Sequence, residues 1–215
     1  MLRSEVRTTS ISINEVYPSI QGEGFLVGTP SLFIRIQGCN LRCPWCDQPS
    51  ALPFKKANTR LEDLMKLVEE YPHKHVVITG GEPFTEGALS DLVKTLLNMG
   101  KRVQIETNGT LWQEALEDVA RYIHITCSPK AIAQWYIHPK IREYASELKL
   151  VVDEELTLDV LLRFEEFLKK GLVVLQPEGN KAPFLNKALE LQRKLLEINY
   201  EVKVLPQVHK LLGLK

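Results

Sequence analysis

Short apolar segments alternate with segments of helical periodicity along the chain, and this alternation limits the folds that it can adopt. Candidate buried strands occupy residues 31–36, 75–81, 102–109, 122–129, 148–152 and 172–177. Helical periodicity occupies residues 59–71, 87–100, 112–122, 156–171 and 182–200. Alternating strands and helices predict a parallel sheet with right-handed crossovers, because each helix packs back onto the sheet. We therefore expect an α/β fold of about six parallel strands, either an open barrel or a doubly wound sheet.

The ends of several elements carry recognisable signals. Thr59 and Glu62 have the spacing of a capping box at the start of a helix. Gly100 and Gly171 follow helical segments and predict C-caps. Two further strand candidates flank the alternating region, at residues 10–17 and 201–209. No linker interrupts the pattern, so we expect a single domain over residues 1–215.

The composition argues against several functional classes. Lys and Arg total 27, as do Asp and Glu, so the formal net charge is zero and there is no strongly basic field for nucleic acid. No apolar run is long enough to span a membrane, and the stretch "MLRSEVRTTSISINEVY" lacks the apolar core of a signal peptide. We therefore expect a cytoplasmic protein without a nucleic-acid or membrane partner. In a reducing cytosol, clustered cysteines are more often metal ligands or redox groups than disulfides.

Polar residues and glycines gather where the candidate strands end. They are Gly80, Gly81 and Glu82, then Glu106, then Ser128 and Lys130, and finally Gln176. The carboxyl ends of parallel strands meet at one edge of the sheet, and active sites form at that edge. Packing alone does not account for so many polar residues at equivalent positions. We therefore expect a functional site there.

Three of the four cysteines, Cys39, Cys43 and Cys46, lie within eight residues after the first candidate strand. Structural zinc needs four ligands, and a disulfide would leave one thiol over. Three thiolates suit an iron–sulfur cluster with one open iron, and an open coordination position is a chemical site. The fourth cysteine, Cys127, lies on another candidate strand, and we expect it to be a core residue. Zinc and a disulfide remain alternatives at this point.

The cysteine loop "GCNLRCPWC" resembles that of the radical S-adenosylmethionine (SAM) superfamily, and "TGGEP" at 79–83 is similar to a glycine motif of the same superfamily. Longer stretches resemble one family within it, the 7-carboxy-7-deazaguanine synthases. These stretches are residues 18–47, 105–110 ("IETNGT"), 128–130 ("SPK"), 147–152 ("ELKLVV") and 207–215 ("QVHKLLGLK"). Together they are spread over the whole chain.

The resemblance implies a partial (β/α) barrel of the radical SAM type with reduced helices. It also implies a [4Fe–4S] cluster whose open iron binds SAM, and an adenosyl radical that takes hydrogen from the substrate, so that no side chain performs the chemistry itself. The family reaction converts 6-carboxy-5,6,7,8-tetrahydropterin to 7-carboxy-7-deazaguanine with loss of ammonia, in the pathway to queuosine and other 7-deazapurines. A homodimer and a reductant such as flavodoxin or ferredoxin are further expectations.

The resemblance also assigns roles to individual residues. The cluster would be bound by Cys39, Cys43 and Cys46. SAM would be bound by Gly80, Gly81, Glu82, Glu106, Ser128, Lys130 and Gln176. The pterin would be bound by Gln21, Gly22, Glu23, Arg35 and His209. The planar guanidinium of Arg35 suits a substrate carboxylate, and the carboxylate of Glu82 would compensate the SAM ammonium.

Gln48 is a departure from the family pattern. The family commonly has threonine after "CD", where the hydroxyl can bind a Mg²⁺ ion held with the substrate carboxylate. The amide oxygen of Gln48 is an acceptable hard ligand, but its longer reach would require a shifted metal ion. The sequence therefore marks Gln48 as the candidate Mg²⁺ ligand and leaves Mg²⁺ dependence open.

Two other functions share part of the signal. A glycyl-radical activating enzyme also carries "GCNLRCPWC", acts on a protein backbone and consumes SAM. A non-enzymatic iron–sulfur electron carrier also needs clustered cysteines. However, a carrier normally closes every cluster position with cysteine and needs neither "GGE" nor "SPK". Both functions stay open as alternatives.

Overall fold

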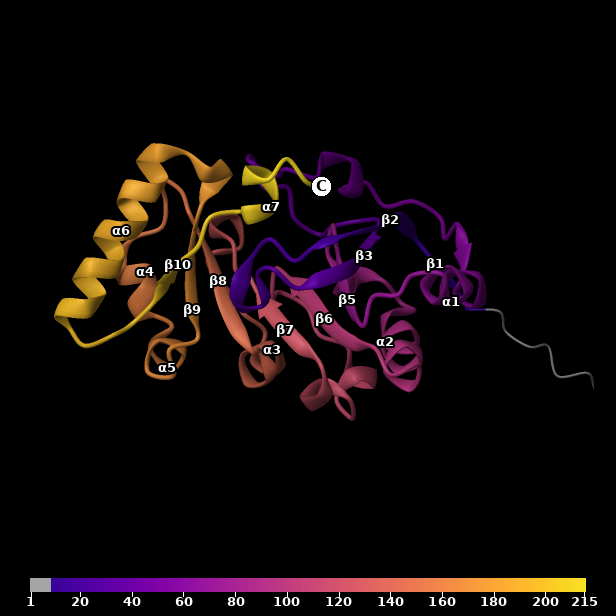
Figure 1. The fold of residues 1–215 in the computed structure, drawn as a ribbon. Coiled ribbons are helices and arrows are strands. Elements are labelled where there is room, and N and C mark those ends of the chain that lie inside the picture. Colours follow the sequence, from indigo (N-terminus) through magenta and orange to yellow (C-terminus); the bar gives the residue numbers. More distant parts are fainter. Residues whose placement is uncertain (1–8) are drawn as a thin grey trace, which may run out of the picture.

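An eight-stranded sheet runs through the structure, a computed structural model that describes residues 9–215 (Figure 1). In sheet order its strands are β10 (Lys203–Val204), β9 (Val173–Pro177), β8 (Glu147–Val152), β7 (His124–Cys127), β6 (Arg102–Thr107), β5 (His75–Gly80), β3 (Pro30–Ile36) and β2 (Ile13–Ile20). Neighbouring strands are parallel except for β2 and β3, which are antiparallel. Residues 1–8, which the single-domain prediction includes, lie outside the described residues.

A short second sheet pairs β1 (Ser10–Ile11) with β4 (Thr59–Arg60). The segment expected as one strand at 10–17 therefore forms β1 and most of β2. This pairing places the N-terminal part of the described chain beside the segment that follows the cysteine loop.

The strands of the main sheet are apolar on both faces, as expected for a parallel sheet that is covered on both sides. Leu32 of β3, Val76 of β5 and Ile105 of β6 are completely buried. Charged residues interrupt these apolar strands at several positions, among them Arg35 in β3 and Lys149 in β8. Both line the cavity described below.

The helices are α1 (Leu61–Glu69), α2 (Leu89–Asn98), α3 (Pro139–Tyr144), α4 (Leu158–Leu162), α5 (Glu165–Leu168), α6 (Ala182–Glu197) and α7 (Val208–Leu211). In Figure 1, α2 to α6 follow one another along the outer side of the sheet, whereas α7 and the C-terminus lie on the other side. None of the helices that the structure describes combines the length and the apolar character that a membrane crossing requires.

Several details of the helix prediction are wrong. Residues 112–122 contain only two 3₁₀ turns and no α-helix. The segment is anchored at its start because Trp112 stacks between Phe84 and Tyr144, with ring centroids 5.6 Å apart in both pairs, so tertiary packing overrides the local helical pattern. The expected helix 156–171 is divided at Phe164 into α4 and α5.

The helix ends are partly as expected. Thr59 belongs to β4 and α1 begins after Arg60 without a side-chain cap, so the capping-box prediction is wrong. Gly100 and Gly171 follow α2 and α5 with φ of +72° and +65°, which confirms both C-cap predictions.

The sheet does not close on itself, because β2 and β10 are its two edges. The C-terminal segment, residues 205–215, leaves β10 and crosses to β2. There the Val208 amide donates to the Gly22 carbonyl over 2.9 Å, and the Ser19 hydroxyl donates to the Lys215 carbonyl over 2.9 Å. The expected strand at 201–209 is therefore limited to β10, and His209 lies on α7. The partial barrel is bridged by a connection that contains no strand.

Candidate active site

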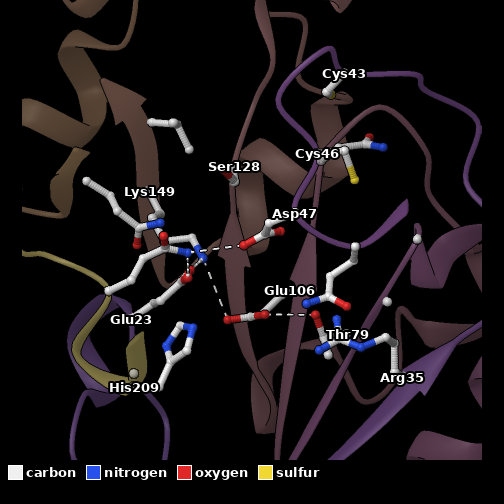
Figure 2. Close-up of a pocket in the computed structure, with 18 of the residues that line it drawn as sticks. Glu23, Arg35, Cys43, Cys46, Asp47, Thr79, Glu106, Ser128, Lys149 and His209 are labelled. Atoms are coloured by element: carbon white, nitrogen blue, oxygen red, sulfur yellow. Dashed lines mark hydrogen bonds and ion pairs between the residues drawn. The ribbon is translucent and has the colours of Figure 1, made fainter. Parts of the chain in front are cut away.

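A cavity of about 340 Å³ lies at the carboxyl edge of the sheet, between the cysteine loop and the C-terminal segment. Figure 2 shows Cys43 and Cys46 at one end of it and Glu23 and His209 at the other. Of the site residues that the sequence predicts, every one except Glu82 lines this cavity. The strand-end argument therefore predicted residues that line one cavity.

The cysteine loop is held by backbone hydrogen bonds to the chain that follows it. The amides of Gly38 and Cys39 donate to the carbonyls of Ala51 and Leu52 over 2.7 and 3.1 Å. Within the loop, the Leu41 amide lies 3.4 Å from the Cys39 sulfur, as a donor to a thiolate would. Burial raises the pKa of the Cys39 and Cys43 thiols. Metal coordination is what would keep such thiols deprotonated.

The donor set of this loop fits a multi-iron cluster. Cys39, Cys43 and Cys46 all line the cavity, yet among residues 9–215 no three Cys, His, Asp or Glu side chains converge closely enough for a single metal ion. A cubane cluster spreads its thiolates over separate irons, so its ligands surround a volume and do not meet at a point. Three thiols around one end of a cavity match that requirement.

The glycine pair after β5 is required by close backbone packing. A Cβ atom on Gly80 would lie 2.3 Å from the Ile36 carbonyl oxygen, and one on Gly81 would lie 2.1 Å from the Gly38 carbonyl oxygen. Gly80 also has a φ of +142°, a backbone conformation that residues with a side chain rarely adopt. The two glycines therefore let the end of β5 pack against the cysteine loop, and both present backbone to the cavity.

Glu82 lies elsewhere than expected. Its side chain is completely buried and outside the cavity lining. The carboxylate accepts hydrogen bonds from the Asn108 amide, the Thr107 hydroxyl and the Phe84 amide, over 2.7, 2.7 and 3.1 Å. Burial raises the pKa of Glu82, which these donors only partly offset. The structure thus gives Glu82 a role in tying the end of β5 to the end of β6, in place of the direct SAM contact that the resemblance implied.

Glu23 and Lys149 form a buried ion pair at the other end of the cavity. Their side chains are 13% and 8% exposed. Glu23 also accepts a hydrogen bond from the Gln207 amide over 2.6 Å. Burial alone would raise the pKa of Glu23, but the Lys149 ammonium and the Gln207 amide lower it to about 2. Glu23 is therefore a permanent anion in the cavity, able only to accept hydrogen bonds.

Glu106, at the end of β6, lies on the other side of Lys149. The Lys149 ammonium is 3.7 Å from its carboxylate. The carboxylate also accepts from Thr79 over 2.8 Å and from Gln21 over 3.2 Å. Burial would lower the pKa of Lys149, but Glu106 and Glu23 raise it above its usual value. One buried cation thus joins the predicted substrate ligand Glu23 to the predicted SAM ligand Glu106.

Arg35 is oriented by two neighbours on β2. Its Nε donates to Glu15 and one Nη to Tyr17, each over 2.8 Å. The other Nη has no protein hydrogen-bond partner among residues 9–215, and Arg35 lines the cavity. A fixed guanidinium with a free donor can accept a carboxylate ligand.

His209 packs directly on Gly22. A Cβ atom on Gly22 would lie 2.1 Å from the His209 Nδ1, so a side chain at position 22 would displace the imidazole. Burial lowers the pKa of His209. The imidazole is thus biased towards its neutral form in the cavity.

The remaining predicted SAM ligands, Ser128, Lys130 and Gln176, also line the cavity. Lys130 donates to Ser128 over 2.6 Å, and its ammonium lies 5.3 Å from the centre of the Trp45 ring. Gln176 is buried, and its side-chain oxygen has no hydrogen-bond partner among the described residues. A buried acceptor without a partner fits an amino group such as that of adenine. This orphaned atom is the observation that best matches a bound SAM.

Gln48 also lines the cavity, at the start of the turn Pro49–Ala51. Its neighbour in sequence, Asp47, pairs with Lys210 over 2.8 Å and accepts from Gln207 at 3.4 Å. These contacts connect the cysteine loop to the C-terminal segment.

Several cavity residues were not among the predicted site residues. Lys149, Asp47, Tyr17 and Gln207 line the cavity, although none of them was predicted to be a site residue. The signal that could have found Lys149 is a lysine inside a buried strand, and Arg35 has a similar position in β3. Asp47 and Gln207 lie inside the stretches that resemble the family, but nothing local in the sequence shows that they meet.

Comparison with known proteins shows the family to which the chain belongs. The model of the Radical SAM superfamily matches residues 33–153, more than half of the chain, and the chain belongs to this superfamily. Over its whole length it is 57% identical to 7-carboxy-7-deazaguanine synthase of Aquifex aeolicus, which it covers completely. It is 32% identical to the enzyme of the same name from Thermoplasma acidophilum, over 93% of the chain and 96% of that protein. The chain is a member of the 7-carboxy-7-deazaguanine synthase family.

Solved structures show the same fold. QueE from Escherichia coli aligns with a TM-score of 0.69 and 28% identity, over 91% of this chain and 93% of that one. Streptococcus suis SuiB bound to S-adenosylmethionine aligns with a TM-score of 0.58 and 14% identity, over 79% of this chain and 48% of SuiB, and this similarity concerns the fold alone. The partial-barrel prediction is confirmed, and neither the activating enzyme nor the electron carrier is favoured.

Proposed function

We propose that the protein converts 6-carboxy-5,6,7,8-tetrahydropterin to 7-carboxy-7-deazaguanine with loss of ammonia. The observation that carries the proposal is one cavity with three cysteines at one end and Arg35, Glu23 and His209 at the other. The full-length relatives named 7-carboxy-7-deazaguanine synthase support it.

The cofactor end of the cavity holds the groups that bind SAM and the cluster. When bound, the cluster and SAM together supply the radical that takes a hydrogen atom from the substrate. Cys39, Cys43 and Cys46 hold the cluster. The buried oxygen of Gln176 accepts from the adenine amino group. Glu106 accepts from the ribose hydroxyls, because its carboxylate is already oriented by Thr79.

The substrate end recognises a small heterocycle with a carboxylate. The free Nη of Arg35 donates to the substrate carboxylate, while Glu15 and Tyr17 fix its plane. The anionic Glu23 accepts from the amino and ring N–H donors of the pterin. His209, held against Gly22, closes this end of the cavity and limits the entry of water.

The finer features of the family extend this proposal. We infer that the enzyme acts in the cytoplasm as a homodimer, takes its electron from flavodoxin or ferredoxin, and binds Mg²⁺ beside the substrate carboxylate through Gln48. The position of Gln48 on the cavity lining supports the last point. An amide oxygen is a suitable hard ligand for this ion.

Anaerobic turnover tests the proposed function. The reconstituted protein, incubated with SAM, dithionite and the carboxypterin, should form 7-carboxy-7-deazaguanine in large excess over 5′-deoxyadenosine. Mass spectrometry of the product and chromatography of the SAM-derived nucleosides provide the measurement. If each event instead consumed one SAM, and if only a protein substrate were modified, the activating-enzyme alternative would replace the proposal.

A further inference from the structure

The loop that follows the cysteine loop exposes an aromatic side chain. Residues 53–58, with the sequence "PFKKAN", are all exposed, and we name them the entry loop. Phe54 is 60% exposed, and among the large hydrophobic side chains it is one of the most exposed in the described residues. A single exposed apolar ring is not unusual by itself, so the case for a binding role rests on its position beside the cysteine loop and on the charges near it in the sequence.

The exposed ring lies directly on the cysteine loop. A Cβ atom placed on Gly38 would be 2.5 Å from Cδ1 of Phe54, so the ring covers the Gly38 backbone. Gly38 immediately precedes Cys39, a predicted cluster ligand. A molecule that covers the Phe54 ring would therefore be separated from the cluster site by one side chain and one residue of backbone.

The segment that carries this ring has an excess of positively charged residues. Between Gln37 and Asn58 the chain carries Arg42, Lys55 and Lys56 against one acid, Asp47, which is paired with Lys210. Within residues 9–215, Lys55 and Lys56 make no ion pair. The whole chain has a formal net charge of zero, so this excess is local.

The entry loop is held in place although its side chains are exposed. The side-chain amide of Gln37 donates to the Pro53 carbonyl over 2.6 Å, and the Ser12 hydroxyl donates to the Lys55 carbonyl over 3.0 Å. Asn58 accepts from the Ile13 amide over 2.9 Å. A loop fixed at its start, middle and end presents a preformed surface, and binding to it requires little ordering.

We propose that the entry loop is the docking surface for an acidic one-electron carrier protein, which covers Phe54 with its redox group and pairs with Lys55 and Lys56. The carrier is oxidised by one electron, and the cluster held by Cys39, Cys43 and Cys46 is reduced by one. This inference rests on the proposed function, because the proposed radical SAM reaction needs this electron. Complementary charge would speed the encounter, and the ring would exclude water at the closest approach.

The test compares a protein reductant with a small one on the cluster-loaded enzyme. Reduced flavodoxin and dithionite are each mixed with wild type, with Phe54→Ala and with Lys55→Glu/Lys56→Glu, and cluster reduction is followed by absorbance. Flavodoxin binding is measured separately by calorimetry. A matched control, Lys169→Glu/Lys170→Glu, reverses two adjacent exposed lysines after α5, next to the opposite end of β9.

Both entry-loop variants should bind flavodoxin at least about tenfold more weakly, and flavodoxin should reduce them correspondingly more slowly. In Lys55→Glu/Lys56→Glu, the rate of reduction by flavodoxin should also depend less on salt concentration than in wild type. Their iron content and dithionite reduction should match wild type, as should every property of the control. Equal flavodoxin kinetics in all four proteins would overturn the inference. So would dissociation of an enzyme dimer by Phe54→Ala, since the surface would then bind a second copy. Failure of the carboxypterin to turn over with dithionite would instead overturn the proposed function.

Discussion

The two ends of the cavity are built in different ways. The cofactor end consists of the cysteine loop and the ends of β5, β6 and β7, and the contacts that hold it are mainly backbone hydrogen bonds and close glycine packing. The substrate end joins the β2–β3 region to β8 and the C-terminal segment through side chains such as Glu23, Lys149 and Gln207. The cofactor end therefore depends on the frame of the sheet. The substrate end depends on individual charges, so single substitutions should affect the two ends differently.

Loss of one cluster ligand should give the largest effect. Cys43→Ala leaves two protein thiolates, so the cluster and all turnover should be lost. Cys127→Ala is the matched control, because Cys127 is completely buried and outside the cavity lining. Iron and sulfide analysis with electron paramagnetic resonance provides the measurement. Loss of the cluster in Cys127→Ala, with Cys43→Ala intact, would show that the ligands have been assigned incorrectly.

Lys149→Met should give the next largest effect, mainly at the substrate end, where Lys149 pairs with Glu23. Breaking a buried ion pair costs about 3–5 kcal/mol, so we expect kcat/KM for the pterin to fall at least about a hundredfold, together with some loss of stability. Lys149→Arg should restore most of the activity. Arg193→Met removes an exposed pair with Glu197 and serves as the control. SAM affinity and iron content are measured in Lys149→Met to test the cofactor end. If both were lost, the lysine would be holding the whole cavity together.

The same variant should change the pH dependence. The pKa of Glu23 is lowered from its usual 4.5 to about 2, so the stabilisation from its ion pair is fully present above pH 4.5 and is lost as the pH falls through 2. Without the Lys149 ammonium, less opposes the effect of burial on Glu23, and the pKa of Glu23 therefore rises. Substrate KM in Lys149→Met should therefore increase at mildly acidic pH, where wild type is unchanged. Parallel KM profiles for the two proteins would contradict this account.

Arg35→Lys should have a smaller effect, again confined to the substrate end. An ammonium cannot donate to Glu15, Tyr17 and a substrate carboxylate with the planar geometry of a guanidinium. A lost charge-assisted hydrogen bond of about 1.5 kcal/mol would raise the KM for the pterin about tenfold. Calorimetry should show unchanged SAM affinity. Weaker SAM binding with normal pterin KM would place Arg35 at the cofactor end.

Substitution of Gln48 should have the smallest effect, because it concerns one ligand of a metal ion that also binds waters and substrate. We expect Gln48→Ala to weaken Mg²⁺ activation a few-fold, and Gln48→Thr to retain it. Initial rates are measured at a series of Mg²⁺ concentrations. If chelation of Mg²⁺ changed the initial rate of neither variant nor of wild type, the metal would be removed from the proposal. The radical chemistry would be unaffected.

The contrast between the two ends also explains what the sequence could predict. The strands, the polar residues at their ends and the cysteine loop are visible as local patterns, so the sequence could predict residues that line one cavity. Motif matching could not show that the Glu82 carboxylate faces backbone donors, because this depends on how the loop after β5 meets β6. The contacts among Glu23, Lys149 and Gln207 join three distant parts of the chain, and no local sequence pattern can predict contacts of this kind. The failed helix at 112–122 has the same origin, since aromatic stacking from two other segments decides its conformation.

The bridge from β10 to β2 has a consequence for the order in which the protein is assembled. The cysteine loop and the ends of β5, β6 and β7 are complete once about the first 130 residues have emerged from the ribosome. The contacts of Val208 with Gly22 and of Lys215 with Ser19 close loops that span most of the chain, and such contacts form late because of their entropic cost. During synthesis, the cluster pocket should therefore form before the substrate pocket. A nascent chain that stalls before residue 205 could hold iron and sulfide while it still has no place for the pterin.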